Sequence, residues 1–284
     1  MEEIKVESPS KINIGLNVVE KRDDGFHNLQ TVFYPLLLSD KLSFQKSNKL
    51  ELNSNTDFLN NLDNNLIIKA IRILENKTGV EIKVKIFIEK FIPIGGGLGG
   101  GSSNAATTLK AINRLFKLGL SYENLITLSL ELGSDVPFFL NHNPAYAESK
   151  GEKLFPLNLE IQYPIVIVNP GINISTRWAF ERVTPEKAKQ NLRAIVDTQK
   201  IDFHNMKTYV KNDFEPVVFK EYPLIEKIKS DLYEKGAQFA LMSGTGSTVY
   251  GIFSNLQKAN WAEEHFKPFY FTYLNNPFDK GSIT

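Results

Sequence analysis

Apolar and polar residues alternate along the first part of the chain. Ile12, Ile14, Leu16 and Val18 are separated by polar or small residues, a period of two that is typical of a strand with one buried face. Asp23-Asp24-Gly25 predicts a turn after this strand. Further short strands are expected at residues 31–38, 42–44 and 50–52. The first fifty residues therefore indicate a β region.

Helical spacing begins at residue 65. Asn65 is a suitable N-cap for a helix over residues 66–77, and Gly79 is placed to end it. Residues 82–89 alternate again and predict a strand. A glycine-rich segment follows, and the apolar spacing after it predicts a helix over 105–115. A second helix is expected over about 122–132, with Gly133 closing it.

The composition of the chain shifts near residue 151. Residues 165–168 predict a short buried strand, helical patterns occupy much of 178–235, and residues 237–253 mix apolar residues with a Ser-Gly-Thr-Gly-Ser segment. No repeat at a fixed period is present. We therefore predict two domains, an N-terminal one over residues 1–159 and a C-terminal one over residues 160–284.

Charge and cysteine content exclude several classes of function. Lys and Arg number 33 and Asp and Glu 32, a net charge of +1, which argues against nucleic-acid binding that depends on bulk positive charge. The absence of cysteine removes disulfides, thiolate metal sites and cysteine nucleophiles. The acidic N-terminus lacks a secretory pattern, and no apolar run approaches the roughly 20 residues that cross a bilayer. We expect a cytoplasmic protein that binds neither nucleic acid nor membrane.

The glycine segment, Gly95–Gly101, contains six glycines in seven positions directly before a predicted helix. Glycine permits positive φ and close approach to the backbone, and a helix start offers unpaired amides and a positive dipole end. Together they predict a phosphate-binding loop. A Walker A loop is excluded because no Lys lies in the segment, and a flexible linker fits poorly between a strand and a helix. The predicted loop comprises Pro93, Ile94, Gly95, Gly96, Gly97, Leu98, Gly99, Gly100, Gly101, Ser102 and Ser103.

Three polar residues are candidates for chemistry. Asp135 precedes Val136-Pro137, so it is either the N-cap of a short helix, the commoner use, or a carboxylate that accepts a proton from an alcohol. Lys11 and Asn13 share one face of the first strand, which indicates either a solvated edge or a cation and an amide that project into a cleft. Beside Asp135, Lys11 would keep the carboxylate ionised and add positive charge near a phosphoryl group.

Several motifs together resemble the GHMP small-molecule kinases. The glycine segment followed by Ser-Ser and two alanines is similar to the phosphate loop of that family. The supporting motifs are Ser8–Asn13, Asp24–Thr31, Gly133–Phe139, Asn169–Gly171 and Ser243–Ser247. The likeness is greatest to those members that phosphorylate a cytidyl diphosphate sugar alcohol in non-mevalonate isoprenoid biosynthesis. It implies an α+β, two-lobed GHMP kinase fold with the active site in the cleft between the lobes.

The resemblance also implies a role for each matching residue. Asp135 would be the catalytic base and Lys11 its charged partner, while Asn65 would lie close to the nucleotide. ATP would be the co-substrate and would bring Mg²⁺. On the substrate side, Asn13 would bind the erythritol end, Phe26 and Phe180 would sandwich the cytosine ring, and His27 would contact its polar edge. Thr176, Gly244 and Thr245 would line this side. The four histidines show no metal-ligand spacing, so no metal site in the protein itself is expected.

Some residues depart from the family pattern, and two alternatives stay open. Asn104 replaces an acidic residue, which predicts weaker Mg²⁺ affinity if that charge helps to hold the metal. Phe26 replaces a tyrosine, and residues 147–151 contain fewer glycines than expected. The chain is alternatively another GHMP kinase that acts on homoserine, mevalonate or a sugar, or a non-catalytic nucleotide- or RNA-binding module. We expect a monomer or a weak homodimer.

Overall fold

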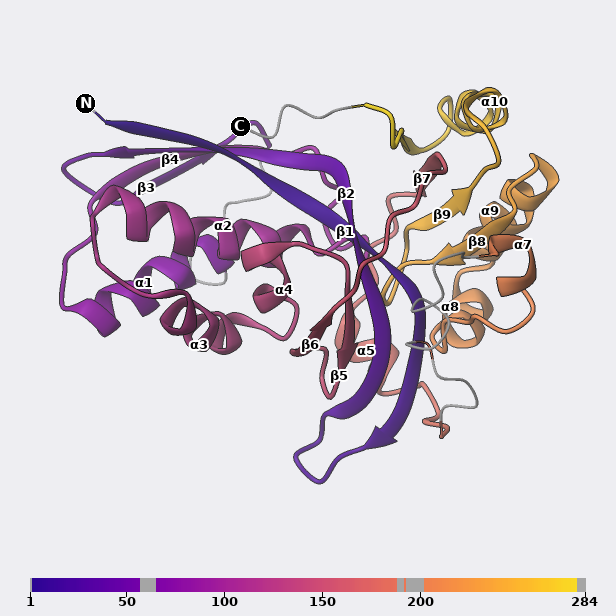
Figure 1. The fold of residues 1–284 in the computed structure, drawn as a ribbon, viewed down its shortest axis with the longest axis horizontal. Coiled ribbons are helices and arrows are strands. Elements are labelled where there is room, and N and C mark those ends of the chain that lie inside the picture. The colour runs from indigo at the N-terminus through magenta and orange to yellow at the C-terminus, as the bar shows by residue number, and fades with distance from the viewer. Residues whose placement is uncertain (1, 57–64, 188–191, 193–201, 280–284) are drawn as a thin grey trace. The chain divides into compact units, whose positions relative to one another are not determined.

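The computed structural model describes residues 2–56, 65–187, 192 and 202–279 (Figure 1). The chain divides into two compact units, and each unit is built from three stretches that are not consecutive in sequence. The first unit comprises residues 1–10, 38–92 and 99–142, and the second comprises residues 11–37, 93–98 and 143–284. The division into domains at residue 159 stays a prediction. Within the predicted helical range 178–235, residues 188–191 and 193–201 lie outside the described part of the chain.

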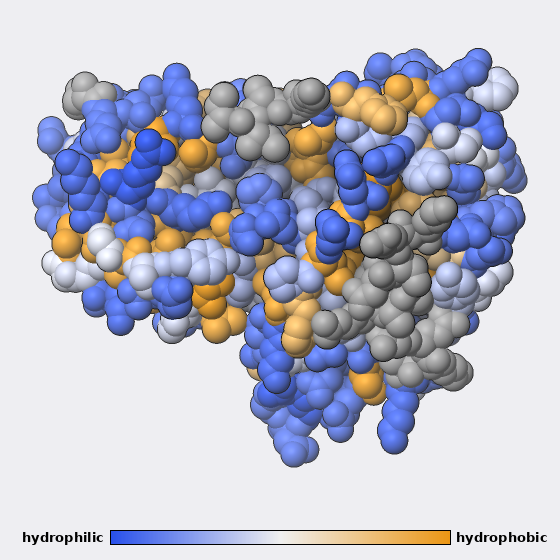
Figure 2. All heavy atoms as spheres, in the orientation of Figure 1, coloured by the Kyte–Doolittle hydropathy of each residue, from blue (hydrophilic) through white to orange (hydrophobic). Residues whose placement is uncertain are grey.

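Two long strands, β1 (Glu3–Lys21) and β2 (His27–Lys46), contribute residues to both units. The predicted turn at Asp23–Gly25 joins them, and Gly25 has a φ of 82°. Hydrophilic side chains cover the tip of this hairpin (Figure 2). The separate strands predicted at 31–38 and 42–44 are one strand, because Asp40 continues the buried face of β2 with a hydrogen-bonded carboxylate.

The first unit combines a small sheet with four helices. β3 (Glu51–Ser54) runs parallel to β4 (Val84–Glu89), and β4 pairs antiparallel with Lys41–Lys46 of β2. The side chains of β4 alternate between buried and exposed, and the helices lie together on one side of this sheet (Figure 1). These helices are α1 (Leu66–Thr78), α2 (Gly100–Leu115), α3 (Tyr122–Leu132) and α4 (Val136–Asn141).

The helix ends of the first unit follow the predicted signals. The Asn65 side chain accepts a hydrogen bond from the amide of Ile67 at the start of α1, and Gly79 ends that helix in the left-handed conformation with a φ of 70°. Gly133 is the C-cap of α3. These predictions are confirmed. The sequence could make them because helix caps depend on local chemistry.

The second unit contains a hairpin and a four-stranded antiparallel sheet. β5 (Ala145–Glu148) pairs with β6 (Lys153–Pro156) and with Thr31–Phe33 of β2. The sheet has the order β10-β7-β9-β8 and is formed by β7 (Ile165–Asn169), β8 (Phe239–Met242), β9 (Val249–Ile252) and β10 (Phe271–Asn275). The helices of this unit are α5 (Thr176–Phe180), α7 (Phe203–Met206), α8 (Glu215–Glu221), α9 (Pro223–Glu234) and α10 (Leu256–Phe266).

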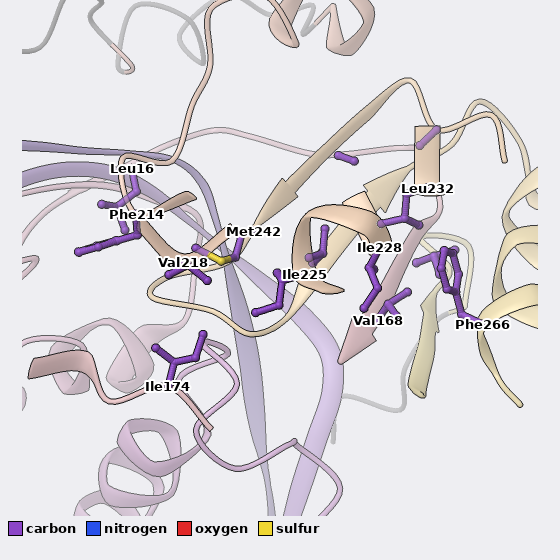
Figure 3. Packing of buried hydrophobic residues seen from close by; sticks show 14 of the residues in the cluster. Leu16, Val168, Ile174, Phe214, Val218, Ile225, Ile228, Leu232, Met242 and Phe266 are labelled. Atoms are coloured by element: carbon purple, nitrogen blue, oxygen red, sulfur yellow. The ribbon is translucent and has the colours of Figure 1, made fainter. Parts of the chain in front are cut away.

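A hydrophobic core packs α5, α8, α9 and α10 against this sheet (Figure 3). Ile225, Ile228 and Leu232 recur at helical spacing and form the buried face of α9. Val168 of β7 and Met242 at the end of β8 belong to the same core. Val249, which begins β9, is also in the core, so both ends of the connection from β8 to β9, which contains the Ser243–Ser247 segment, are anchored. None of the helices in the described ranges has the length and apolarity required to span a bilayer.

Candidate functional site

The glycine segment divides between the two units after Leu98. In the first unit, α2 begins at Gly100 after Gly99, which has a φ of 72°, and no side chain caps the helix. The first amides of a helix lack intrahelical partners and lie at the positive end of its dipole. A Cβ atom added to Gly101 would lie 3.7 Å from Leu66 Cδ1. The start of α1, with Asn65 as its cap, therefore lies beside the first turn of α2.

In the second unit, the glycines before Leu98 pack closely against other backbone and side-chain groups. A Cβ atom on Gly95 would lie 2.3 Å from Asn173 Oδ1, and one on Gly97 would lie 2.1 Å from the carbonyl oxygen of Ser243. The Ser243 hydroxyl donates to the carbonyl of Gly97 at 2.9 Å. The backbone amide of Lys11 donates to the carbonyl of Leu98 at 3.0 Å. This part of the segment is therefore a packed structure and not a flexible linker. Internal packing explains these glycines, where the sequence indicated only phosphate approach.

Lys11 and Asn13 are buried side by side in the second unit, with 3% and 2% of their surfaces exposed. Lys11 Nζ donates to Asn13 Oδ1 at 2.6 Å and to the carbonyl of Gly97 at 3.3 Å, and it lies 5.0 Å from the ring centroid of Phe33. The solvated-edge interpretation of these residues is therefore wrong. The arrangement places an ammonium group directly against the predicted phosphate loop.

Asp135 occupies the N-cap position of α4, and Pro137 lies in the first turn as expected. Its backbone has a φ of −84° and a ψ of −15°, and its side chain makes no capping hydrogen bond to the helix. The capping interpretation is thus correct for the position but not for the bonding. Asp135 belongs to the first unit and Lys11 to the second, and their pairing stays a prediction.

Two of the predicted substrate-side residues of the second unit form an aromatic pair. The ring of His27 stacks on Phe180 with centroids 5.2 Å apart and planes inclined by 26°. Phe180 also packs edge-on against Phe214 at 4.9 Å, so it takes part in core packing as well. Phe26 is 57% exposed and lies beneath the ammonium group of Lys150 at 4.8 Å. Phe26 is therefore not a core residue, and its stacking on cytosine stays a prediction.

Burial lowers the pKa of His27, and the positive charge of Lys21 lowers it further. The imidazole therefore remains neutral at neutral pH, when one ring nitrogen donates and the other accepts a hydrogen bond. Such a group suits the mixed donor and acceptor edge of a pyrimidine better than a permanent cation does.

Threonine and glycine residues connect this aromatic pair to the loop. The hydroxyls of Thr176, at the start of α5, and Thr245 lie 3.5 Å apart. A Cβ atom on Gly244 would lie 3.2 Å from the carbonyl oxygen of Gly97 and 3.5 Å from Asn13 Oδ1. The structure thus joins the predicted substrate-side residues of the second unit other than Phe26 in one continuous group, from Lys11 to Phe180.

Sequence reasoning missed residues that hold this group in place. Ser243 bonds Gly97, and the Asn169 amide donates to the Thr248 hydroxyl at 2.8 Å. Asn212 donates to the carbonyls of Met242 and Gly244, each at 2.8 Å. The first two lie in motifs that the sequence had marked, but nothing near Asn212 signals its role. Within the described ranges, no cluster of three or more His, Asp or Glu residues could hold a metal ion.

Comparison with known proteins shows the family to which the chain belongs. Family models match twice, as the GHMP kinases N terminal domain over residues 65–143 and as the GHMP kinases C terminal domain over residues 192–270. A crystal structure of 4-(cytidine 5'-diphospho)-2C-methyl-D-erythritol kinase superposes with a TM-score of 0.82 at 30% identity, covering 95% of this chain and 98% of that one. A homoserine kinase from Cytophaga hutchinsonii, at 16% identity and a TM-score of 0.69, shares the fold.

Curated relatives are similar over almost the whole chain. A 4-diphosphocytidyl-2-C-methyl-D-erythritol kinase of Thermodesulfovibrio yellowstonii is 39% identical over 92% of this chain and 93% of its own. One from Chlorobium phaeobacteroides is 40% identical over 98% and 99%. The chain is thus a GHMP kinase, and its α+β fold with N- and C-terminal GHMP domains is as predicted. Within that class it belongs to the family of the 4-diphosphocytidyl-2-C-methyl-D-erythritol kinases.

Proposed function

We propose that this chain transfers the γ-phosphoryl group of ATP to the 2-hydroxyl of 4-diphosphocytidyl-2-C-methyl-D-erythritol, in non-mevalonate isopentenyl diphosphate biosynthesis. One observation supports this substrate above other alcohols: the stacked pair of His27 and Phe180, joined through α5 to Thr176, Thr245 and the glycine segment. A flat aromatic surface and a neutral imidazole suit a cytosine ring, whereas homoserine, mevalonate and sugars carry no aromatic ring to stack on it.

The catalytic roles in this proposal follow from the chemistry of phosphoryl transfer, which depends on positioning and charge. Asp135 accepts the proton of the acceptor hydroxyl. Lys11 stabilises the charge of the transferring group or of Asp135. The amides of the first turn of α2 bind the triphosphate, and Asn65 lies close to the nucleotide. Mg²⁺ arrives with ATP, because it binds through phosphate oxygens and few protein ligands.

The remaining assignments belong to the same proposal. Asn13 binds the erythritol end of the substrate, and Phe26 and Phe180 flank its base. Thr176, Gly244 and Thr245 line the substrate side. The protein acts in the cytoplasm as a monomer or a weak homodimer, with small molecules and no nucleic acid as partners.

A comparison of acceptors tests the proposal directly. ADP release is measured with the cytidyl substrate, homoserine, mevalonate and galactose at equal ATP, and ³¹P NMR identifies the phosphorylated position. We expect a kcat/KM for the cytidyl substrate at least about 100-fold above the others, since a single lost base stack accounts for a large part of that ratio. Higher turnover of mevalonate or homoserine would overturn the substrate assignment and leave the kinase class intact.

A further inference from the structure

Asp40 has a fully buried carboxylate in the first unit. Its hydrogen bonds link the residues just before the glycine segment to the helix just after it. Its Oδ1 accepts hydrogen bonds from the amides of Phe91 and Ile92, both at 2.9 Å, directly before Pro93. Its Oδ2 accepts from Asn104 Nδ2 at 2.9 Å and from the ammonium group of Lys90. One side chain therefore holds both the chain after β4, which leads into the segment, and the helix that follows the segment.

The amide of Asn104 is fully used in this network. Its Nδ2 donates to Asp40 and to the Ser8 hydroxyl, each at 2.9 Å, and its Oδ1 accepts from Lys90 at 3.3 Å. The Ser8 hydroxyl in turn lies 2.7 Å from that of Ser103, which belongs to the predicted phosphate loop. Asn104 is 4% exposed, so its side chain is directed into the protein. Its place there differs from the expectation that a residue at this position helps to hold Mg²⁺.

The negative charge of Asp40 explains why position 104 holds an asparagine and not an acidic residue. A carboxylate there would lie against the Asp40 carboxylate and could donate nothing to it, whereas the amide donates to one neighbour and accepts from the other. Lys90 balances the single negative charge, and a Cβ atom on Gly100 would lie 3.4 Å from its Nζ. A buried ion pair of this kind contributes little net stability against a well-packed apolar alternative, and its best-attested use is to fix one arrangement.

We propose that Asp40 and Asn104 are positioning residues for ATP. They hold Phe91–Ile92 and the first turns of α2 at the separation that lets the helix amides meet the phosphates. The inference rests on the proposed function, in which the first turn of α2, which reaches Ser103, binds the triphosphate. It predicts that the network controls affinity for ATP more than affinity for the cytidyl substrate.

A charge swap tests this inference. In Asn104→Asp two carboxylates face each other, and in Asp40→Asn two amide groups face each other. In the double variant the amide at position 40 donates to the carboxylate at position 104, which also accepts from Lys90 and Ser8. The net charge and the bond between the two side chains are restored, while Lys90 pairs with position 104 in place of position 40. We expect each single variant to raise the Kd for ATP by about tenfold, as loss of a charged hydrogen bond does. The double variant should return to within about threefold of the unaltered protein, and the KM for the cytidyl substrate should stay unchanged throughout.

The measurement is calorimetric binding of ATP with Mg²⁺, carried out well below the melting temperature of each variant. The matched control is Asn113→Ala, at the other end of α2, where the side chain bonds the backbone of Leu120 at 2.9 and 3.1 Å. This control should lower the melting temperature and leave the Kd for ATP unaltered.

Three results would decide against the inference or its basis. Single variants that bind ATP as tightly as the unaltered protein would show that the network only stabilises the fold, and so would a double variant that does not recover. If Asp40→Asn fails to fold, Asn104→Asp and the double variant decide the question alone. An unaltered protein that binds no ATP would instead overturn the proposed function.

Discussion

The imidazole of His27 lies on the ring of Phe180, with centroids 5.2 Å apart, although one residue begins β2 and the other ends α5. Phe180 also makes an edge contact with Phe214 of the core, with centroids 4.9 Å apart. The core therefore fixes the orientation of Phe180, and Phe180 in turn supports the imidazole. A rigid pair of this kind provides a flat surface without loss of rotamer freedom on binding.

Replacing Phe180 by leucine should weaken binding of the cytidyl substrate. Base stacking on an aromatic ring contributes about 1–3 kcal/mol, so the KM should rise by about 5- to 150-fold. The kcat and the KM for ATP should change little, because the ring takes no part in phosphoryl transfer. Steady-state kinetics with each substrate varied in turn measures this. Phe219→Leu, in a phenylalanine that packs against the same core, is the control, and an equal effect of both variants would assign Phe180 to packing alone.

The pKa of His27 predicts how stability depends on pH. Burial lowers this pKa in the folded protein, while the unfolded chain titrates near 6.5. As the pH falls below about 6.5, the unfolded chain takes up a proton first, so the free energy of unfolding decreases until the folded pKa is passed. Urea unfolding at pH 7.5 and pH 5.5 should show a smaller loss for His27→Gln than for the unaltered protein. Burial and Lys110 also lower the pKa of His142, and that contribution persists in the variant. An identical loss in both proteins would contradict the prediction.

Local chemistry explains why much of the fold was predictable from the sequence. The bounds of α1 and α3 follow from caps at Asn65, Gly79 and Gly133, and β4 follows from strict alternation. The continuity of β2 was missed, because Ser39-Asp40-Lys41 is a polar interruption unless partners for Asp40 are known. Those partners, Lys90 to Ile92 and Asn104, are distant in sequence and leave no periodic signal.

The sequence predicted which residues belong to the candidate site, but it did not predict which neighbours require each of them. Lys11 and Asn13 were correctly placed on one face, but only tertiary contacts show that this face is buried. Gly97 was assigned to phosphate approach, whereas the carbonyl of Ser243 occupies the space that a side chain would need. A motif records that a glycine is required and does not record which neighbour requires it.

Two glycine variants separate internal packing from ligand approach. In Gly97→Ala the new Cβ atom would lie 2.1 Å from a backbone oxygen, at a φ of 78°, so we expect a loss of at least about 3 kcal/mol in the free energy of unfolding. Gly101→Ala lies inside α2 with its nearest neighbour at 3.7 Å, and alanine favours a helix over glycine by about 1 kcal/mol.

Gly101→Ala should therefore fold at least as stably as the unaltered protein, while its Kd for ATP rises because the added methyl group lies where the phosphates approach. Urea unfolding and calorimetric titration of ATP measure the two effects. Unchanged ATP affinity in Gly101→Ala would place the triphosphate elsewhere.

Substitution of Asp135 by asparagine should separate catalysis from helix capping. The Asp135 side chain makes no capping bond to α4, and asparagine is as good an N-cap as aspartate, so the free energy of unfolding should change by less than about 0.5 kcal/mol. ATP affinity should stay within about threefold, since only the proton acceptor is removed. The kcat should fall by about 10²- to 10⁴-fold, the usual contribution of a general base. Quenched-flow measurement of a single turnover isolates this step from product release, and undiminished turnover would restrict Asp135 to a structural position at the start of the helix.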